Sequence, residues 1–368
     1  MILQKISLTN FKNYEDIEID FSKGLNCFTG LNGSGKTNLL DAIHYLSLTK
    51  SAFNSIDSQN IRHNTTYFAI RARFEAKNKH HKLTCSLKQG EKKIFKMDDS
   101  AYDKLSEHIG KFPVVLIAPN DDDLIRESSE IRRKFVDSII SQTDKKYLSN
   151  LIQYTQCLKQ RNSLLKIINE TRKRDNDLLA QYDDQIIKLS LDLAKVRQTF
   201  INTILPEFIF QYKFLCAEKE QVDIKYETKA LDSDFSEKLK SSIEKDIILQ
   251  RTTMGIHRDD YTFLINKKPL KKFGSQGQQK SFLIGLKLSQ FDYIKQKQGI
   301  TPLLLLDDIF DKLDDERIQK LVQMIEEKRF EQIFLTDARR ERTQNILLNI
   351  NIELKVFNLD ENTINIVS

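Results

Sequence analysis

The 368-residue chain has no tryptophan and only four cysteines, five prolines and eleven glycines. Cys27, Cys85, Cys157 and Cys216 lie far apart without a Cys-x-x-Cys pair, so we expect buried thiols and neither a disulfide framework nor a zinc site. Its apolar runs, such as residues 303–306, are far shorter than the roughly 18 residues that cross a bilayer. With no readable secretion signal, we expect a cytoplasmic protein without membrane association.

Composition and charge narrow the class further. Apolar residues make up 40% and charged residues 30% of the chain, at a mean hydropathy of −0.46, which excludes collagen-like, mucin-like and fully disordered chains. The net charge of +6 is uneven, since residues 251–300 hold ten Lys/Arg against three Asp/Glu and residues 301–368 hold nine against fourteen. Such a basic block is either a solvated face or a surface that attracts phosphate backbones.

The apolar pattern predicts an α/β region that is interrupted by helices. Apolar stretches before residue 30 predict three strands that lead to a glycine-rich turn, and a 3.6-residue spacing from residue 37 predicts a helix. No Pro or Gly interrupts residues 130–205, so we expect long amphipathic helices that end at Pro206. The α/β pattern resumes near residue 255. We therefore predict an α/β head from residues 1–130 and 251–368, with a helical arm inserted at residues 131–250.

A glycine-rich motif after the third expected strand fits the phosphate-loop pattern G-x-x-x-x-G-K-[ST]. Its residues, with the one that follows, are Gly30, Leu31, Asn32, Gly33, Ser34, Gly35, Lys36, Thr37 and Asn38. The glycines let backbone N–H groups turn toward phosphate oxygens, and the helix that follows directs its positive end at the anion. Lys36 adds a charge and Thr37 a hydroxyl for Mg²⁺, so the motif predicts a nucleotide and Mg²⁺ site.

Two adjacent carboxylates, Asp307 and Asp308, follow the apolar run at residues 303–306. The run predicts a buried parallel strand whose end presents both side chains. We expect Asp307 to orient Mg²⁺ through water and Asp308 to polarise the attacking water, with Lys36 as the third catalytic group. The alternative is a strand end that is capped by a solvated turn. Since Lys36 and Asp307 are far apart in the chain, the nucleotide fold must accommodate an insertion.

A second anion-binding segment, residues 273–281, precedes an expected helix. Small residues and amides at a helix N-terminus bind anions, and one nucleotide cannot readily use both this segment and the loop within one subunit. We call it the signature segment. Its candidate contact residues are Ser275, Gln276, Gly277 and Gln278.

Together these motifs resemble the RecF family of SMC-like ABC ATPases over nearly the whole chain. The matching strings occur in order at residues 8–14, 30–47, 112–137, 255–260, 275–281 and 307–314. The resemblance implies an ABC-type ATPase head with a mixed sheet and an inserted helical arm. It implies that the signature segment contacts ATP bound to a partner subunit, so that ATP and Mg²⁺ hold a homodimer together.

The resemblance also implies a function in recombinational repair and replication restart. It implies binding of single-stranded and gapped duplex DNA at the nucleoid, RecR and RecO as partners, and a weak DNA-stimulated ATPase that acts as a switch. The alternatives are a transporter ATPase subunit, a structural SMC protein and a nuclease with an ATPase head. The roughly 110-residue insertion is too short for an extended coiled coil with a hinge, at about 1.5 Å per helical residue.

Some positions depart from the family or ABC patterns. Lys12 stands where Arg is more usual and Asp41 where Glu is common. Asp308 stands where most ABC ATPases have Glu, as the resemblance implies for RecF, and its shorter reach leads us to expect slow hydrolysis. Thr336 or Asp337 occupies the place of the ABC switch histidine. Around residues 119–121 we assign no residue to the magnesium-contacting Gln of ABC proteins.

Several polar residues have two open interpretations. His257 is either a γ-phosphate sensor or a residue that orders its loop, beside Arg258. Arg132 and Arg133 lie either on a solvated helix face or against DNA or the other head. Four lysines close to the signature segment are either surface residues or phosphate contacts without base readout. They are Lys267, Lys268, Lys271 and Lys272.

Overall fold

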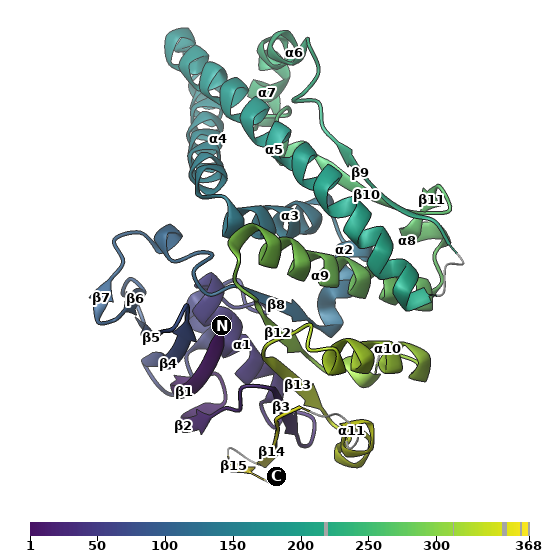
Figure 1. The fold of residues 1–368 in the computed structure, drawn as a ribbon. Coiled ribbons are helices and arrows are strands. Elements are labelled where there is room, and N and C mark those ends of the chain that lie inside the picture. The colour runs from purple at the N-terminus through teal and green to yellow at the C-terminus, as the bar shows by residue number, and fades with distance from the viewer. Residues whose placement is uncertain (217–219, 312, 348–351, 361–362, 367–368) are drawn as a thin grey trace. The chain divides into compact units, whose positions relative to one another are not determined.

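The computed structural model describes residues 1–216, 220–311, 313–347, 352–360 and 363–366 (Figure 1). Lys312, in the 307–314 string, and residues 367–368 of the predicted head lie outside them. The chain forms two compact units. The first comprises Met1–Asp121, Gln211–Ala217 and Lys280–Ser368, and the second comprises Asp122–Phe210 and Glu218–Gln279. The predicted insertion at residues 131–250 is thus shorter than the second unit, which also takes in the 255–260 string.

A six-stranded, mostly parallel sheet forms the centre of the first unit, in the order β15-β14-β3-β13-β12-β8. All its neighbouring strands pair in parallel except β14 and β15. Strands β3, β12 and β13 are buried at every position, as expected where a parallel sheet is covered on both faces. The strands are β3 (Leu25–Thr29), β8 (Val114–Ile117), β12 (Leu303–Leu306), β13 (Ile333–Asp337), β14 (Leu354–Asp360) and β15 (Thr363–Ile366).

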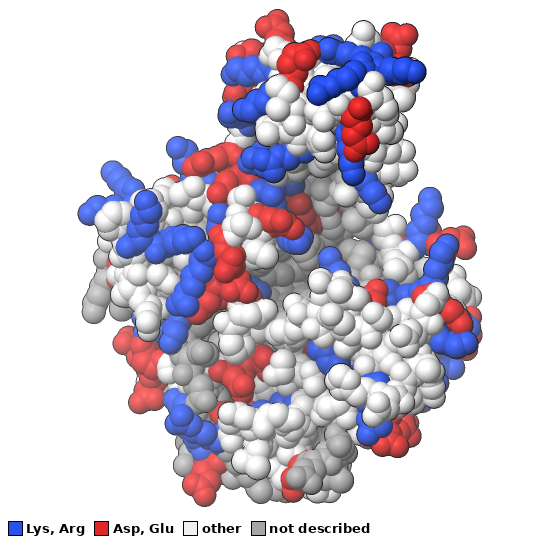
Figure 2. Space-filling view, turned by 180° about the vertical axis from the view of Figure 1, so that it is seen from behind, with Lys and Arg blue, Asp and Glu red and all other residues white. Residues whose placement is uncertain are grey.

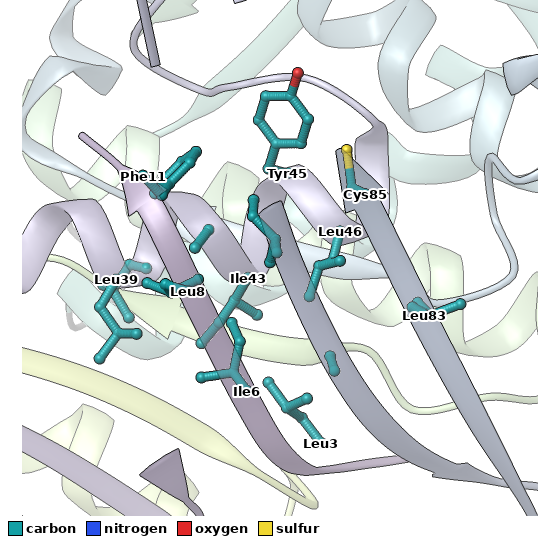
Figure 3. Packing of buried hydrophobic residues seen from close by; sticks show 14 of the residues in the cluster. Leu3, Ile6, Leu8, Phe11, Leu39, Ile43, Tyr45, Leu46, Leu83 and Cys85 are labelled. Atoms are coloured by element: carbon teal, nitrogen blue, oxygen red, sulfur yellow. The ribbon is translucent and has the colours of Figure 1, made fainter. Parts of the chain in front are cut away.

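A second sheet of this unit is antiparallel, in the order β2-β1-β4-β5-β6-β7. Alternate residues of its longer strands are buried, so one face packs on the core and the other meets solvent. Figure 3 shows Ile6 and Leu8 of β1 and Leu83 of β5 on the side of the sheet where Ile43 and Leu46 of α1 pack. The strands are β1 (Ile2–Phe11), β2 (Tyr14–Asp20), β4 (Tyr67–Ala76), β5 (Lys79–Lys88), β6 (Ile94–Met97) and β7 (Ser100–Ala101).

The helices of the first unit follow the strands that they cover. Helix α1 starts directly after the glycine-rich turn, as its spacing predicts. The helices and 3₁₀ turns are α1 (Lys36–Leu48), η1 (Asp57–Asn60), η2 (Leu105–Glu107), η5 (Ile309–Asp311), α10 (Asp315–Glu326), α11 (Arg340–Leu347) and all but the first turn of α9 (Gln276–Gln298).

The second unit is mainly helical, with one three-stranded sheet in the order β11-β10-β9. Figure 2 shows both signs of charge mixed over its end that carries α6 and α7. Its elements are α2 (Asp123–Arg126), α3 (Ser129–Thr143), α4 (Lys145–Thr171), β9 (Val222–Glu227), α6 (Phe235–Ser241), α7 (Ile243–Leu249), η4 (Ile256–Arg258), β10 (Asp260–Ile265), β11 (Lys268–Pro269) and α8 (Leu270–Phe273). Helix α5 (Asn176–Cys216) belongs to this unit up to Phe210, and η3 (Pro119–Asp122) belongs to the first unit except for Asp122.

One predicted helix end is wrong. Pro206 lies inside α5, which continues to Cys216. Ile204 and Phe208, on either side of it, are buried, so the apolar packing of this helix outweighs the backbone hydrogen bond that proline removes.

The structure also bears on the predictions about the cysteines and about membrane-spanning segments. All four cysteines are free, and three are buried, while Cys216 is half-buried. No helix in the described part of the chain is long and apolar enough to span a bilayer.

Candidate nucleotide site

The glycine-rich loop connects β3 to α1 and contains backbone conformations that favour glycine. Gly30 has φ 153° and Gly35 has φ 100°. A Cβ atom on Gly30 would lie 2.3 Å from the carbonyl oxygen of Leu359, and one on Gly35 would lie 2.5 Å from Nδ2 of Asn13. Both positions therefore exclude a side chain for two reasons, the backbone angle and the space.

Lys36 and Thr37 open helix α1 at the end of this loop. The buried Lys36 ammonium donates to the carbonyl oxygens of Gly30 and Leu31, at 2.8 and 2.9 Å. These contacts hold the charge inside the curve of the loop, where the motif requires it for phosphate contact. The Thr37 hydroxyl instead contacts the acidic strand end, at Asp307.

The Asp307 carboxylate accepts a hydrogen bond from that hydroxyl. Oγ1 of Thr37 lies 2.9 and 3.1 Å from the two carboxylate oxygens of Asp307, and the buried hydroxyl of Thr336 donates to Oδ1 at 2.8 Å. The contact arises because β12 pairs in parallel with β13, and β13 with β3, so their carboxyl ends meet. Burial raises the pKa of Asp307, and the hydrogen bonds from Thr336 and Thr37 and the charge of Lys36 oppose that rise.

Asp308 has a left-handed backbone with φ 46°, which is uncommon for a residue with a side chain. Its N–H donates to Oγ1 of Thr336 at 3.0 Å. Thr336 therefore links the side chain of one predicted catalytic carboxylate to the backbone of the next. Asp337 makes different contacts. Its carboxylate accepts hydrogen bonds from the N–H of Arg339 at 2.8 Å and from the hydroxyl of Thr343 at 2.5 Å, at the start of α11.

Residues at the turn between β1 and β2 form hydrogen bonds with the loop and the first turn of α1, a feature that the motif alone did not indicate. The Tyr14 hydroxyl donates to the carbonyl oxygen of Gly35 at 2.9 Å, and Nδ2 of Asn38 donates to Oδ1 of Asn13 at 2.7 Å. Burial raises the pKa of Tyr14, so its hydroxyl stays protonated and remains a donor.

The region of the ABC magnesium-contacting Gln holds a different arrangement. Asp121 pairs with Nζ of Lys287 at 2.6 Å, and Lys287 also donates to the carbonyl oxygen of Leu116 at 2.8 Å. Asn120 is exposed. The carboxylate of Asp121 is therefore engaged within the first unit.

The signature segment belongs mainly to the second unit, whereas the loop belongs to the first. The N–H of Ser275 donates to Oε1 of Gln278 at 2.7 Å, and the N–H of Gln278 donates to Oγ of Ser275 at 3.2 Å. This reciprocal pair is a capping box at the start of α9. Ser275 and Gln276 are exposed, while Gly277 and Gln278 are half-buried.

His257 is held on both ring nitrogens. Nε2 lies 3.0 Å from the carbonyl oxygen of Thr252, which can only accept, so Nδ1 accepts from the Tyr154 hydroxyl at 2.6 Å. Burial lowers the pKa of His257 to about 4, with the hydrogen bond to Thr252 opposing the shift. The contacts favour the interpretation in which His257 orders its loop, while Arg258 is exposed.

Arg132 and Arg133 make contacts inside the second unit. Arg132 donates through Nε and Nη2 to the two carboxylate oxygens of Asp260, at 2.8 and 3.0 Å, and Arg133 donates to the carbonyl oxygen of Asp259 at 2.6 Å. Of the four lysines near the signature segment, Lys271 donates to the carbonyl oxygen of Arg126 at 2.5 Å. Lys267, Lys268 and Lys272 are exposed.

Comparisons with known proteins agree with one another. The family model described as RecF/RecN/SMC N terminal domain matches residues 2–358. DNA replication and repair protein RecF of Flavobacterium johnsoniae is 45% identical over 359 residues, which cover 98% of this chain and 100% of the relative. The same-named protein of Bacteroides thetaiotaomicron is 43% identical over 366 residues, or 99% and 98% of the two chains. The chain belongs to the RecF family.

Solved structures of other proteins have the same fold as this chain. The recombination mediator protein RecF-ATP in the RecFOR pathway matches with a TM-score of 0.89 and 28% identity, covering 100% of this chain and 97% of that one. The Smc head domain of Pyrococcus furiosus matches with a TM-score of 0.57 at 17% identity, covering 99% and 95%. The predicted RecF family and the predicted SMC-like α/β head with a helical arm are therefore confirmed, which decides against the transporter and nuclease alternatives.

Proposed function

We propose that this chain is an ATP-dependent DNA-binding protein of recombinational repair and replication restart, whose homodimer is controlled by ATP and Mg²⁺. The observation that carries the proposal is the cluster at the strand ends, where Lys36, Thr37, Asp307 and Thr336 converge on one anion-binding loop. The relative solved as RecF-ATP supports the choice of nucleotide.

The donor set fits a magnesium ion. The Thr37 hydroxyl and the Asp307 carboxylate lie within hydrogen-bond distance of each other, and both offer the oxygen ligands that Mg²⁺ prefers. Mg²⁺ would neutralise charge on the phosphates when bound. Lys36 holds a positive charge in the loop for the β- and γ-phosphates, Asp307 orients the metal shell through water, and Asp308 polarises the attacking water. The shorter reach of Asp308 supports weak hydrolysis that acts as a switch.

The signature segment completes the site from a second copy of the chain. Ser275 and Gln276 are exposed at the N-terminus of α9, where the positive end of the helix attracts anions. With Gly277 and Gln278, they would contact the nucleotide held by the loop of the partner. ATP then links two heads, and its hydrolysis releases them.

The homodimer would bind single-stranded and gapped duplex DNA at the nucleoid and act with RecR and RecO. The support is family membership and the relatives named for DNA replication and repair and for the RecFOR pathway. His257 and Arg258 have no assigned part in these contacts.

The test is sedimentation with gapped duplex DNA, without nucleotide, with ATP and Mg²⁺, and with a non-hydrolysable analogue. The proposal requires a mass shift to a DNA-bound dimer only with nucleotide. Lys36→Ala abolishes both dimerisation and DNA binding, whereas Ser275→Arg leaves a monomer that still binds ATP. The control Lys23→Ala, an exposed lysine of the same unit, behaves as wild type. A Ser275→Arg protein that dimerises normally with ATP rules out the signature contact.

A further inference from the structure

The outer face of the antiparallel sheet, opposite the packed face of Figure 3, carries basic residues on β1, β4 and β5. It holds a groove of about 410 Å³ across β2, β1, β4 and β5. We call it the basic groove. Its lining residues are Lys5, Ser7, Glu18, Arg71, Ala72, Arg73 and Lys82.

Three cations stand in one row across this groove. Lys5 of β1 is directly opposite Arg73 of β4, and Arg73 is directly opposite Lys82 of β5. Like charges at directly opposed positions destabilise a sheet. The ion pair with Glu18 raises the pKa of Lys5, and the charge of Arg73 opposes that rise, as expected for cations this close. The sheet therefore carries a charge arrangement that its own folding does not favour.

Carboxylates offset only the two ends of the row. Nζ of Lys5 lies 2.5 Å from Glu18 and 3.8 Å from Asp20, and Nζ of Lys82 lies 3.2 Å from Asp99. Within the described part of the chain, no carboxylate oxygen lies within 4.0 Å of the guanidinium of Arg73, which is exposed. The centre of the row thus keeps its full positive charge.

A second row runs beside the first and offers hydroxyls. Arg71 of β4 is directly opposite Ser7 of β1 and Thr84 of β5. Among the described residues, the only polar contact of its side chain is a long hydrogen bond from Nη1 to Oγ1 of Thr9, at 3.5 Å. Arg71 and Arg73 share one face of one strand, so their Cα atoms are about 6.8 Å apart at about 3.4 Å per residue. The groove presents two exposed guanidinium groups in line, with hydroxyls at its side.

We propose that the basic groove binds the sugar–phosphate backbone of DNA. Guanidinium groups match phosphate oxygens in charge and in bidentate geometry. The lining contains only charged side chains, one serine and one alanine, so it lacks the apolar anchors on which protein partners depend. The contacts carry no base readout, and binding is independent of sequence.

The carboxylates at the edge of the sheet limit where the DNA backbone can lie in the groove. Strand β2 places Asp16, Glu18 and Asp20 on the same face as the basic row, opposite Thr9, Ser7 and Lys5. These carboxylates repel phosphate on one side of the groove. The DNA backbone therefore lies over β4 and β5, along Arg71, Arg73 and Lys82.

The test uses the full chain and fluorescence anisotropy with a labelled duplex, in the presence of a non-hydrolysable ATP analogue. In Arg71→Gln/Arg73→Gln, two phosphate contacts disappear, so the slope of log K against log salt becomes shallower by about 1.8. Between 50 and 200 mM salt, the wild-type protein then loses about 12-fold more affinity than the variant does. The matched control is Lys23→Gln/Lys328→Gln, two exposed lysines elsewhere in the same unit, whose slope equals that of wild type.

Separate readouts distinguish this inference from the proposed function on which it rests. ATP binding and ATP-dependent dimerisation of the groove variant, measured by sedimentation without DNA, stay at wild-type values, because neither arginine touches the nucleotide loop. Equal slopes for wild type and the groove variant overturn the inference and leave the proposed function intact. If wild type binds no DNA with any nucleotide, both fall. Loss of binding to polyglutamate with unchanged DNA binding assigns the groove to an acidic protein and also overturns the inference.

Discussion

Thr336→Val is expected to destabilise the first unit more than any other single hydroxyl deletion at the strand ends. The Thr336 side chain is fully buried, donates to Asp307 Oδ1 at 2.8 Å and accepts from the N–H of Asp308 at 3.0 Å. Valine has nearly the same shape but makes neither bond. A hydrogen bond to a charged group contributes about 1.5–3 kcal/mol, and a buried donor without its acceptor costs about 1–3 kcal/mol. We expect a loss of about 3 kcal/mol.

The loss depends on pH through Asp307. Burial raises the pKa of Asp307 in the folded protein, so the native state holds this proton to higher pH than the unfolded chain does. Its ionisation therefore lowers stability as pH rises above about 4. Since the Thr336 hydroxyl opposes the shift, valine raises the pKa of Asp307 further. The destabilisation by Thr336→Val is thus larger at pH 8 than at pH 5.

Urea denaturation at both pH values measures this effect. Thr336→Ser keeps the hydroxyl and restores most of the stability. Thr301→Val is the matched control, because Thr301 is also buried and its hydroxyl makes no hydrogen bond to the described residues; we expect a change below about 1 kcal/mol. If Thr336→Val and Thr301→Val lose the same stability, or if the loss at pH 5 equals that at pH 8, the network around Asp307 does not act as described.

Three further predictions concern single positions. Arg73→Thr relieves the like-charge row and should raise the melting temperature by about 1 °C in calorimetry while weakening DNA binding; a lower melting temperature would contradict the repulsion argument. Ser275→Ala removes the capping box and should cost about 1 kcal/mol in urea denaturation of the second unit, without changing ATP affinity by equilibrium dialysis. His257 has its pKa lowered to about 4, so its neutral form is favoured on folding, and stability is lost as pH falls from about 6.5 toward 4. His257→Gln should flatten that part of the pH–stability curve, and an unchanged curve would show that His257 is not buried neutral.

The nucleotide loop and the acidic strand were predictable because their signal is local. The glycines before Lys36 and the four leucines before Asp307 each encode one element and its end, and the structure has β3, α1 and β12 in those places. Local motifs do not reveal which strands are neighbours. The role of Thr336 as a link depends on the pairing of β12 with β13, and so sequence reasoning reached only its approximate place.

The interior of the second unit could not be predicted for the same reason. Arg161 is fully buried and pairs with Asp183 and Asp246, at 2.6 and 2.7 Å. Arg197 is almost fully buried and pairs with Asp137 and Asp259, both at 2.9 Å. In sequence these arginines look like the charged positions of amphipathic helices, since helical spacing does not distinguish a solvated charge from one that is paired between helices. Buried pairs of this kind depend on partners brought together only by the fold.

The two departures in the first part of the chain are one structural feature. Nζ of Lys12 lies 2.6 Å from Oδ2 of Asp41, which is fully buried and also accepts from the hydroxyl of Ser51 at 2.6 Å and the N–H of Ala52 at 2.7 Å. The family resemblance led us to expect Arg in place of Lys12 and Glu in place of Asp41, and the structure pairs these two side chains with each other. A buried carboxylate that lost its cation would be strongly unfavourable. The pair therefore joins the β1–β2 turn to α1, the helix that begins with Lys36 and Thr37.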